Sequence, residues 1–174
     1  MQVTNFAVTG ALFLAAGAGL TRAAGPERGS KRDARLLEVA GMALLGSAVL
    51  ATDPVSGYPA GSPDALSSPT ITGTLHNLCG AGVFLGLPAA AAAAGWRALR
   101  QGRPGWAAYC AGTAATMLTA AIAAGAGFSQ SPRLVNVAGL CQRVAIVTGF
   151  GWVSVRSGRA LRQVTASGTR PAGR

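Results

Sequence analysis

Two residues that could move protons, Asp53 and His76, lie in a polar stretch between long apolar runs. This stretch is ATDPVSGYPAGSPDALSSPTITGTLHNLCG, residues 51–80, and it holds the only histidine of the chain and two of its five acidic residues. A carboxylate and an imidazole work as a general acid and base when both reach one substrate. We therefore predict Asp53 and His76 as candidate catalytic residues.

The composition around this stretch indicates a membrane protein. Hydrophobic residues make up 50% of the 174 residues, charged residues only 11%, and the mean hydropathy is +0.39. A soluble domain carries about 25% charged residues, and its helices show a polar stripe to water that is missing here. Five apolar runs approach the roughly 20 residues needed to cross a bilayer: 4–21, 36–52, 69–94, 106–127 and 132–157. The sequence predicts an all-α, polytopic transmembrane bundle of five helices.

The net charge of +10 follows the predicted topology. Basic residues gather in alternate connections, at 22–35 and 97–103, and in the C-terminal tail. Cytoplasmic loops are enriched in Lys and Arg, so the pattern predicts an external N-terminus and a cytoplasmic C-terminus in the cell inner membrane. Nucleic acid is not expected as a partner, because topology already accounts for the charge. Trp96, Trp106 and Trp152 are expected at the cytoplasmic interface, where indole rings concentrate.

Capping residues and prolines place the helix ends. Ser68-Pro69 and Ser131-Pro132 each read as an N-cap followed by proline at the first helical position. Asp53-Pro54 is expected to close the second helix. We predict one transmembrane domain over residues 1–157 and a short, basic, disordered tail over 158–174.

These boundaries place ionisable residues in the outer half of the membrane. His76 would lie about 10 Å deep and Arg143 about 16 Å deep, at 1.5 Å per residue. An arginine at that depth costs about 2.5 kcal/mol or more unless it finds a partner, so we expect it to turn inward and pair with Asp53. The residues predicted to bind a substrate, in a pocket roofed by the loop at 53–68, are Asn5, Asn77, Gln142 and Arg143.

No metal or other cofactor is expected. The chain has one histidine, and Cys79, Cys110 and Cys141 lie in apolar runs at spacings that match no metal or redox motif. We predict that they are free thiols. No phosphate-binding loop and no nucleophile elbow is present.

Several blocks of the sequence resemble the domain-of-unknown-function 998 family over nearly the whole chain up to Ser157. The blocks are TNFAVTGALFLAAGAGL, LLEVAGMALLGSAVLATDPVSGYPAGSP, GTLHNLCGAGVF and GLCQRVAIVTGFGWVSV; the matching motif residues are Asn5, Asp53, Pro54, Gly57, Pro59, Gly61, Gly73, His76 and Arg143. The resemblance implies a small bacterial or archaeal integral membrane protein, usually with six helices and with no activity common to the family. This chain begins at the family's second helix. Either its start lies upstream, or five spans suffice, with a homodimer completing the bundle.

Two functions stay open. A membrane-embedded enzyme would use Asp53 and His76 to hydrolyse, isomerise or cyclise an amphiphilic or lipid-soluble substrate near the outer leaflet. A non-catalytic protein would bind a lipid or another membrane protein, with Arg143 holding an anionic head group. The sequence places the enzyme first.

Overall fold

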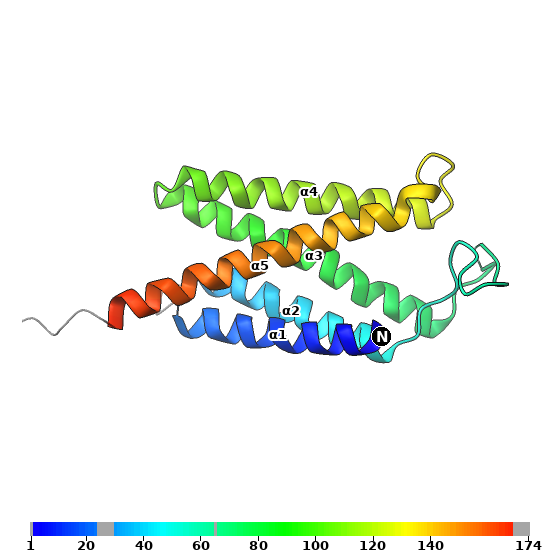
Figure 1. Ribbon diagram of the computed structural model, residues 1–174, viewed down its shortest axis with the longest axis horizontal. Helices are drawn as coiled ribbons and strands as arrows, with labels where there is room; N and C mark the ends of the chain where they lie inside the picture. Colours follow the sequence, from blue (N-terminus) through cyan, green and yellow to red (C-terminus); the bar gives the residue numbers. More distant parts are fainter. Residues whose placement is uncertain (1, 24–29, 65, 169–174) are drawn as a thin grey trace, which may run out of the picture.

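The computed structural model describes residues 2–23, 30–64 and 66–168. In these residues the chain forms an up-and-down bundle of α-helices without a β-strand, which confirms the all-α prediction (Figure 1). The elements are α1 (Gln2–Ala23), α2 (Ser30–Val49), α3 (Ile71–Arg100), α4 (Pro104–Phe128), the short 3-10 helix η1 (Val135–Val137) and α5 (Ala138–Gly168).

Helices α1, α3, α4 and α5 are long and apolar enough to cross a membrane. The first half of α2 is too charged to meet the same measure, because Lys31, Arg32, Asp33, Arg35 and Glu38 crowd it. Even so, α2 packs along both α1 and α3. The chain is therefore a multi-pass membrane protein, and its apolar helices place it in a lipid bilayer.

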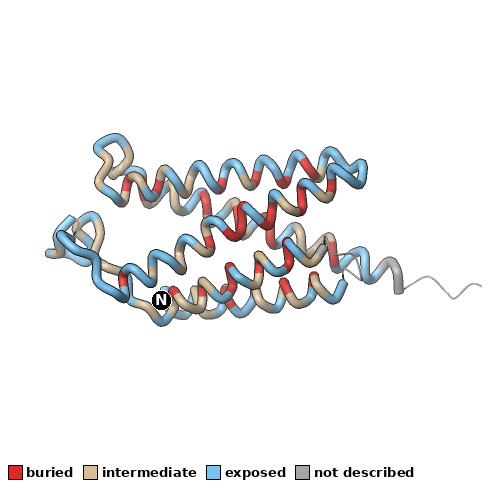
Figure 2. Tube along the Cα trace, turned by 180° about the vertical axis from the view of Figure 1, so that it is seen from behind, coloured by how far each residue is buried: buried red, intermediate tan, exposed pale blue. Residues whose placement is uncertain are grey.

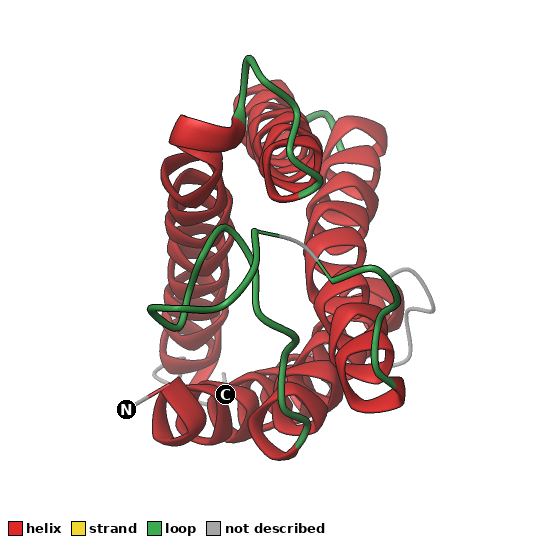
Figure 3. Cartoon of the chain, turned by 90° about the vertical axis from the view of Figure 1, so that its right-hand side faces the viewer, coloured by secondary structure: helices red, strands yellow, loops and turns green. Residues whose placement is uncertain are grey.

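Each helix packs mainly against its neighbours in the sequence, and α5 then crosses the bundle obliquely. Figure 1 shows α5 starting beside α4 and running across to the end of the bundle where α1 finishes, while Figure 3 shows the helices end on. We call the end where α1 and α3 finish the basic end, and the opposite end, which carries residues 50–70, the loop end. Helix α5 makes few contacts with α1 and α3 and many more with α4.

Small residues bring the helix axes close together. Gly10 of α1 faces Gly41 of α2, and a Cβ on Gly10 would lie 2.8 Å from the Gly41 carbonyl oxygen. Buried residues line the inward sides of the helices, as Figure 2 shows, and include a run of alanines in α3. Trp152 is also buried, at 1% exposure, and its Nε1–H donates to Cys110 Sγ at 3.3 Å. Trp152 is thus packed in the core, whereas Trp96 is exposed, and their depth in the membrane stays a prediction.

The cysteines of the described chain are free thiols, as predicted. Cys110 is buried, and Cys79 and Cys141 are half-buried.

The loop end is tied together by one side chain. Gln130, between α4 and α5, donates from Nε2 to Ser56 Oγ and to the Asp64 carbonyl oxygen, both at 3.1 Å. Within the loop the Ser56 N–H donates to the same carbonyl at 2.8 Å, and Gly57 takes a φ of 70°, a left-handed conformation that favours glycine. The loop between α2 and α3 is thus fastened to the connection that precedes α5.

Several predicted helix ends need correction. The N-cap of α3 is Thr70 and not Ser68, and α2 already ends at Val49, before Asp53-Pro54. Helix α5 begins at Ala138, after η1, and not at Pro132. It also continues to Gly168, so the part of the expected disordered tail up to that residue is helical. Residues 169–174 lie outside the described part.

Candidate functional site

Asp53, predicted as catalytic, binds the start of α3. Its Oδ1 accepts from Thr70 Oγ1 at 2.6 Å, and its Oδ2 accepts from the Thr70 N–H at 3.0 Å. Thr70 Oγ1 in turn accepts from the Gly73 N–H at 3.0 Å, which is an N-cap bond. Both carboxylate oxygens are therefore used in capping a helix, where the helix dipole favours a negative charge.

His76, the second predicted catalytic residue, joins α3 to the end of α2. Its Nδ1–H donates to the Leu50 carbonyl oxygen at 2.9 Å, because a carbonyl can only accept. The ring is half-buried and lies 6.4 Å from the ring of Phe6. This bond satisfies a carbonyl that the helix end leaves without an intrahelical partner.

The described contacts do not link the predicted substrate-binding residues to Asp53 or His76, so their common role stays a prediction. Asn5 and Asn77 are exposed, and Asn5 accepts from Thr9 Oγ1. Across the described chain neither Gln142 nor Arg143 makes a hydrogen bond or ion pair with Asp53, whose oxygens Thr70 occupies. The expected ion pair between Asp53 and Arg143 is not formed.

The reason lies in the start of α5. Arg143 follows Ala138 by only five residues, so it is about 8 Å from the helix start at 1.5 Å per residue. This depth is half of that expected from a start at Pro132, and the side chain is exposed. An arginine so near a helix end reaches the interface without needing an internal acceptor.

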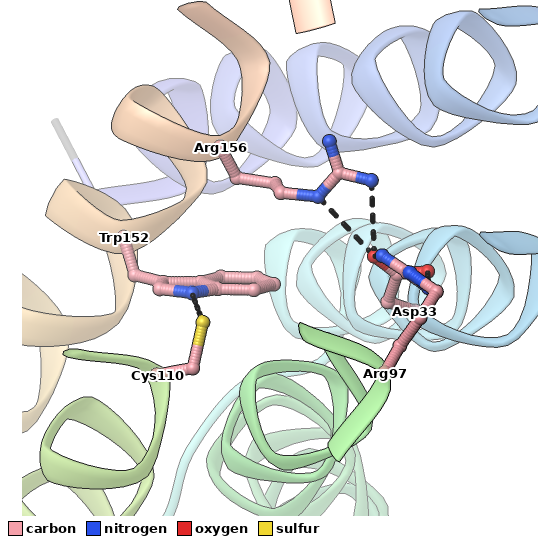
Figure 4. Close-up of polar contacts among 5 residues, drawn as sticks. All are labelled: Asp33, Arg97, Cys110, Trp152 and Arg156. Carbon is pink, nitrogen blue, oxygen red and sulfur yellow. Dashed lines mark hydrogen bonds and ion pairs between the residues drawn. The ribbon is translucent and has the colours of Figure 1, made fainter. Parts of the chain in front are cut away.

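A different charged cluster is buried at the basic end, and Figure 4 shows it. Asp33 of α2 is 1% exposed and pairs with Arg97 of α3 and Arg156 of α5, whose side chains are 18% and 12% exposed. Three helices that are far apart in the sequence thus meet on one carboxylate. We call Asp33, Arg97 and Arg156 the charged triad.

The two arginines of the charged triad bind Asp33 differently. Arg97 forms a fork, in which Nη1 donates to Oδ1 and Nη2 to Oδ2, both at 2.9 Å. Arg156 donates from Nε and Nη2 to Oδ2 alone, both at 3.2 Å. Planar two-bond pairing is the stronger arrangement, so Arg97 is the principal partner.

A pocket of about 280 Å³ opens beside the charged triad. Its lining comes from α1, α3, α5, the start of α4 and the connection between α3 and α4: Leu20, Ala23, Ala94, Arg97, Ala98, Gln101, Arg103, Trp106, Arg156, Arg159, Ala160 and Gln163. Among the described residues, Asp33 pairs with two of the four arginines on the lining, so the described lining carries excess positive charge and attracts anions. We call it the basic pocket.

One wall of the basic pocket is a cation stacked on an aromatic ring. The Arg159 guanidinium carbon lies 4.3 Å from the ring centroid of Trp106, within the range of a cation–π contact. Trp106 also stacks on Tyr109, with ring centroids 5.1 Å apart. These contacts hold Arg159 at the pocket, and no acidic residue of the described ranges pairs with it.

The sequence carried a signal for Asp33 that the predicted helix start at residue 36 concealed. Leu37, Ala40 and Leu44 are buried at helical spacing on one face of α2. Extending that spacing one turn toward the N-terminus arrives at Asp33. The helix begins at Ser30, so Asp33 belongs to the buried face and not to a solvated loop.

Comparison with known proteins identifies the chain at the level of its family. No curated protein and no solved structure matches it. The model of one protein family, described as "Protein of unknown function (DUF998)", matches residues 1–157. That match covers the four helices long enough to cross a membrane, apart from the last turns of α5. The chain belongs to the DUF998 family of membrane proteins.

Proposed function

We propose that the protein binds an anionic amphiphile without chemical change, and that the phosphate group of this ligand enters the basic pocket. The observation that carries the proposal is the pocket itself, in which four arginines line about 280 Å³ next to the charged triad. At about 30 Å³ per water molecule, this volume holds a phosphate group with its hydration, and it is too small for a whole lipid.

Arginine suits phosphate because its planar guanidinium donates two parallel N–H groups. The ring of Trp106 fixes the orientation of Arg159 before a ligand arrives. Side chains that are already ordered lose less entropy on binding. The basic pocket is therefore prepared for a phosphate group.

The position of the pocket favours an amphiphile. It lies at the ends of helices long enough to span the bilayer, where phospholipid head groups reside. The apolar residues on its lining, such as Leu20 and Ala94, are buried in the core, so the surface open to a ligand is mainly polar. A ligand with a phosphate head in the pocket and an apolar tail in the adjoining bilayer fits this position.

The catalytic role of Asp53 and His76 receives less support. Both carboxylate oxygens of Asp53 accept hydrogen bonds from Thr70, and Nδ1 of His76 donates to the Leu50 carbonyl oxygen. These contacts account for both residues through helix capping alone. Binding at the basic pocket therefore replaces acid–base chemistry as the function that we favour.

Lipid binding tests the proposal directly. The full-length protein in neutral detergent is mixed with phosphatidic acid, phosphatidylglycerol or phosphatidylcholine, and bound lipid is counted by native mass spectrometry. We expect the anionic lipids to bind more tightly, and Arg159→Gln to weaken them about tenfold, since a charged hydrogen bond contributes about 1.5 kcal/mol or more. Inorganic phosphate and pyrophosphate serve as head groups without a tail.

Two arginines provide matched controls. Arg100 is exposed at the same end of α3 but does not line the pocket, and Arg143 is exposed near the loop end. Their glutamine variants should bind lipid like the wild type. Equal losses in Arg100→Gln and Arg159→Gln would mean that only general surface charge attracts lipid, and a loss confined to Arg143→Gln would place the ligand at the loop end. Binding of pyrophosphate as tight as that of phosphatidic acid would refute the need for a tail.

A further inference from the structure

We infer that Asp33 is an internal competitor for the basic pocket, and that Arg156 turns from Asp33 to the phosphate group when a ligand binds. The inference rests on the anion binding proposed above and adds its regulation. In the absence of ligand, Asp33 occupies donors of Arg156 that a phosphate oxygen would use.

The bonds of Arg156 are the ones that can exchange. Oδ2 of Asp33 receives three N–H groups, one from Arg97 at 2.9 Å and two from Arg156 at 3.2 Å. Charged N–H···O bonds of good geometry measure about 2.7–2.9 Å, so the crowded pair from Arg156 is the weaker set. A phosphate oxygen competes with a contact that is already long.

Loss of Arg156 would leave Asp33 paired. A buried carboxylate without a partner is strongly destabilising, and Asp33 is 1% exposed. The fork from Arg97 meets both of its oxygens, so Arg156 can depart while the carboxylate stays neutralised. Departure of Arg97 would break this fork. Only one of the two arginines is therefore suited to serve the ligand.

The packing around Arg156 also has unused polar groups. Among the described residues, Thr21 Oγ1 and Ser157 Oγ are buried without a hydrogen-bond partner. Thr21 follows Leu20 and Ser157 follows Arg156, and both of these neighbours line the basic pocket. Buried hydroxyls usually find partners, so these two donors next to lining residues stay unused in the structure.

The affinity of an Asp33→Asn variant tests the competition. We expect the dissociation constant for phosphatidic acid to fall roughly tenfold. It is measured by native mass spectrometry on the full-length protein. An Asp53→Asn variant removes a carboxylate at the loop end and should leave the constant unchanged. Unchanged or weaker binding in Asp33→Asn would overturn the inference.

A double-mutant cycle separates competition from general electrostatics. In an Arg156→Gln background, Asp33→Asn should no longer tighten binding, because the residue for which Asp33 competes is gone. If Asp33 only lowered the local potential, its removal would tighten binding equally in both backgrounds. Equal effects would therefore contradict the exchange of Arg156.

A second variant covers the case in which Asp33→Asn does not fold. The pair Asp33→Asn with Arg97→Gln replaces the buried fork by two uncharged amides, so neither partner is left as an unpaired buried charge. It leaves Arg156 without a competitor, so we expect tighter binding than in the wild type, and weaker binding would refute the inference. The wild-type protein tests the proposed function separately: if it binds neither phosphatidic acid nor pyrophosphate, anion binding itself fails.

Discussion

The carboxylates of Asp33 and Asp53 stabilise opposite ends of the bundle, and each lies at the start of a helix. Asp33 lies in the first turn of α2 and Asp53 binds the first residues of α3, so each stands where the helix dipole favours a negative charge. They differ in their partners. Asp33 neutralises two arginines and is buried, whereas Asp53 accepts only from Thr70 and is half-buried.

At the residue scale, Asp53→Asn should lower stability because an amide cannot accept on both sides of Thr70. We expect a loss of about 1 kcal/mol, typical of a helix cap, visible as a lower apparent melting temperature in detergent. Asp64→Asn is the matched control, since Asp64 is exposed in the same loop. Equal melting temperatures for the two variants would contradict a capping role.

At the scale of whole helices, the close crossing of α1 and α2 depends on glycine. Gly10 and Gly41 approach each other from both sides: a Cβ on either would lie under 3 Å from the carbonyl oxygen of the other. Backbones this close are typical of membrane helices. In a bilayer the hydrophobic effect does not drive helices together, and small residues let them associate through close van der Waals packing. The α1–α2 pair is thus set by two positions without side chains.

Gly10→Ala should therefore push α1 away from α2. We expect destabilisation of about 1–3 kcal/mol, the usual effect of overpacking, measured by thermal unfolding. Gly19 lies in the same helix with nothing within 4 Å of an added Cβ, so Gly19→Ala should be neutral or stabilising by up to about 1 kcal/mol. Similar behaviour of the two variants would argue against a tight crossing at Gly10.

For the whole molecule, the distribution of charge predicts orientation. The N-terminal helix α1 starts at the loop end and α5 finishes at the basic end, so the basic end is expected in the cytoplasm. Reporter fusions test this: alkaline phosphatase inserted after Gly61 should be active outside, and a cytoplasmic reporter fused to the C-terminus should be active inside. The reverse pattern would contradict the orientation.

The number and order of the helices could be predicted from the sequence, because membrane helices are recognised by the hydropathy of a local stretch of residues. The polar contacts did not follow in the same way. Asp33 and Arg156 are 123 positions apart, and their meeting depends on the oblique path of α5, which no local pattern encodes. The expected ion pair between Asp53 and Arg143 is absent for a local reason, since α5 starts at Ala138 and not at Pro132, which places Arg143 nearer the helix end.

The bond of Gln130 to the loop has a mechanical consequence. It fastens the connection after α4 to the loop at one end, while the far end of α5 is attached through Asp33 and Trp106. We expect any swing of α5 to pivot near that connection. A small angular change there becomes the largest displacement at the opposite tip of the helix, beside the basic pocket.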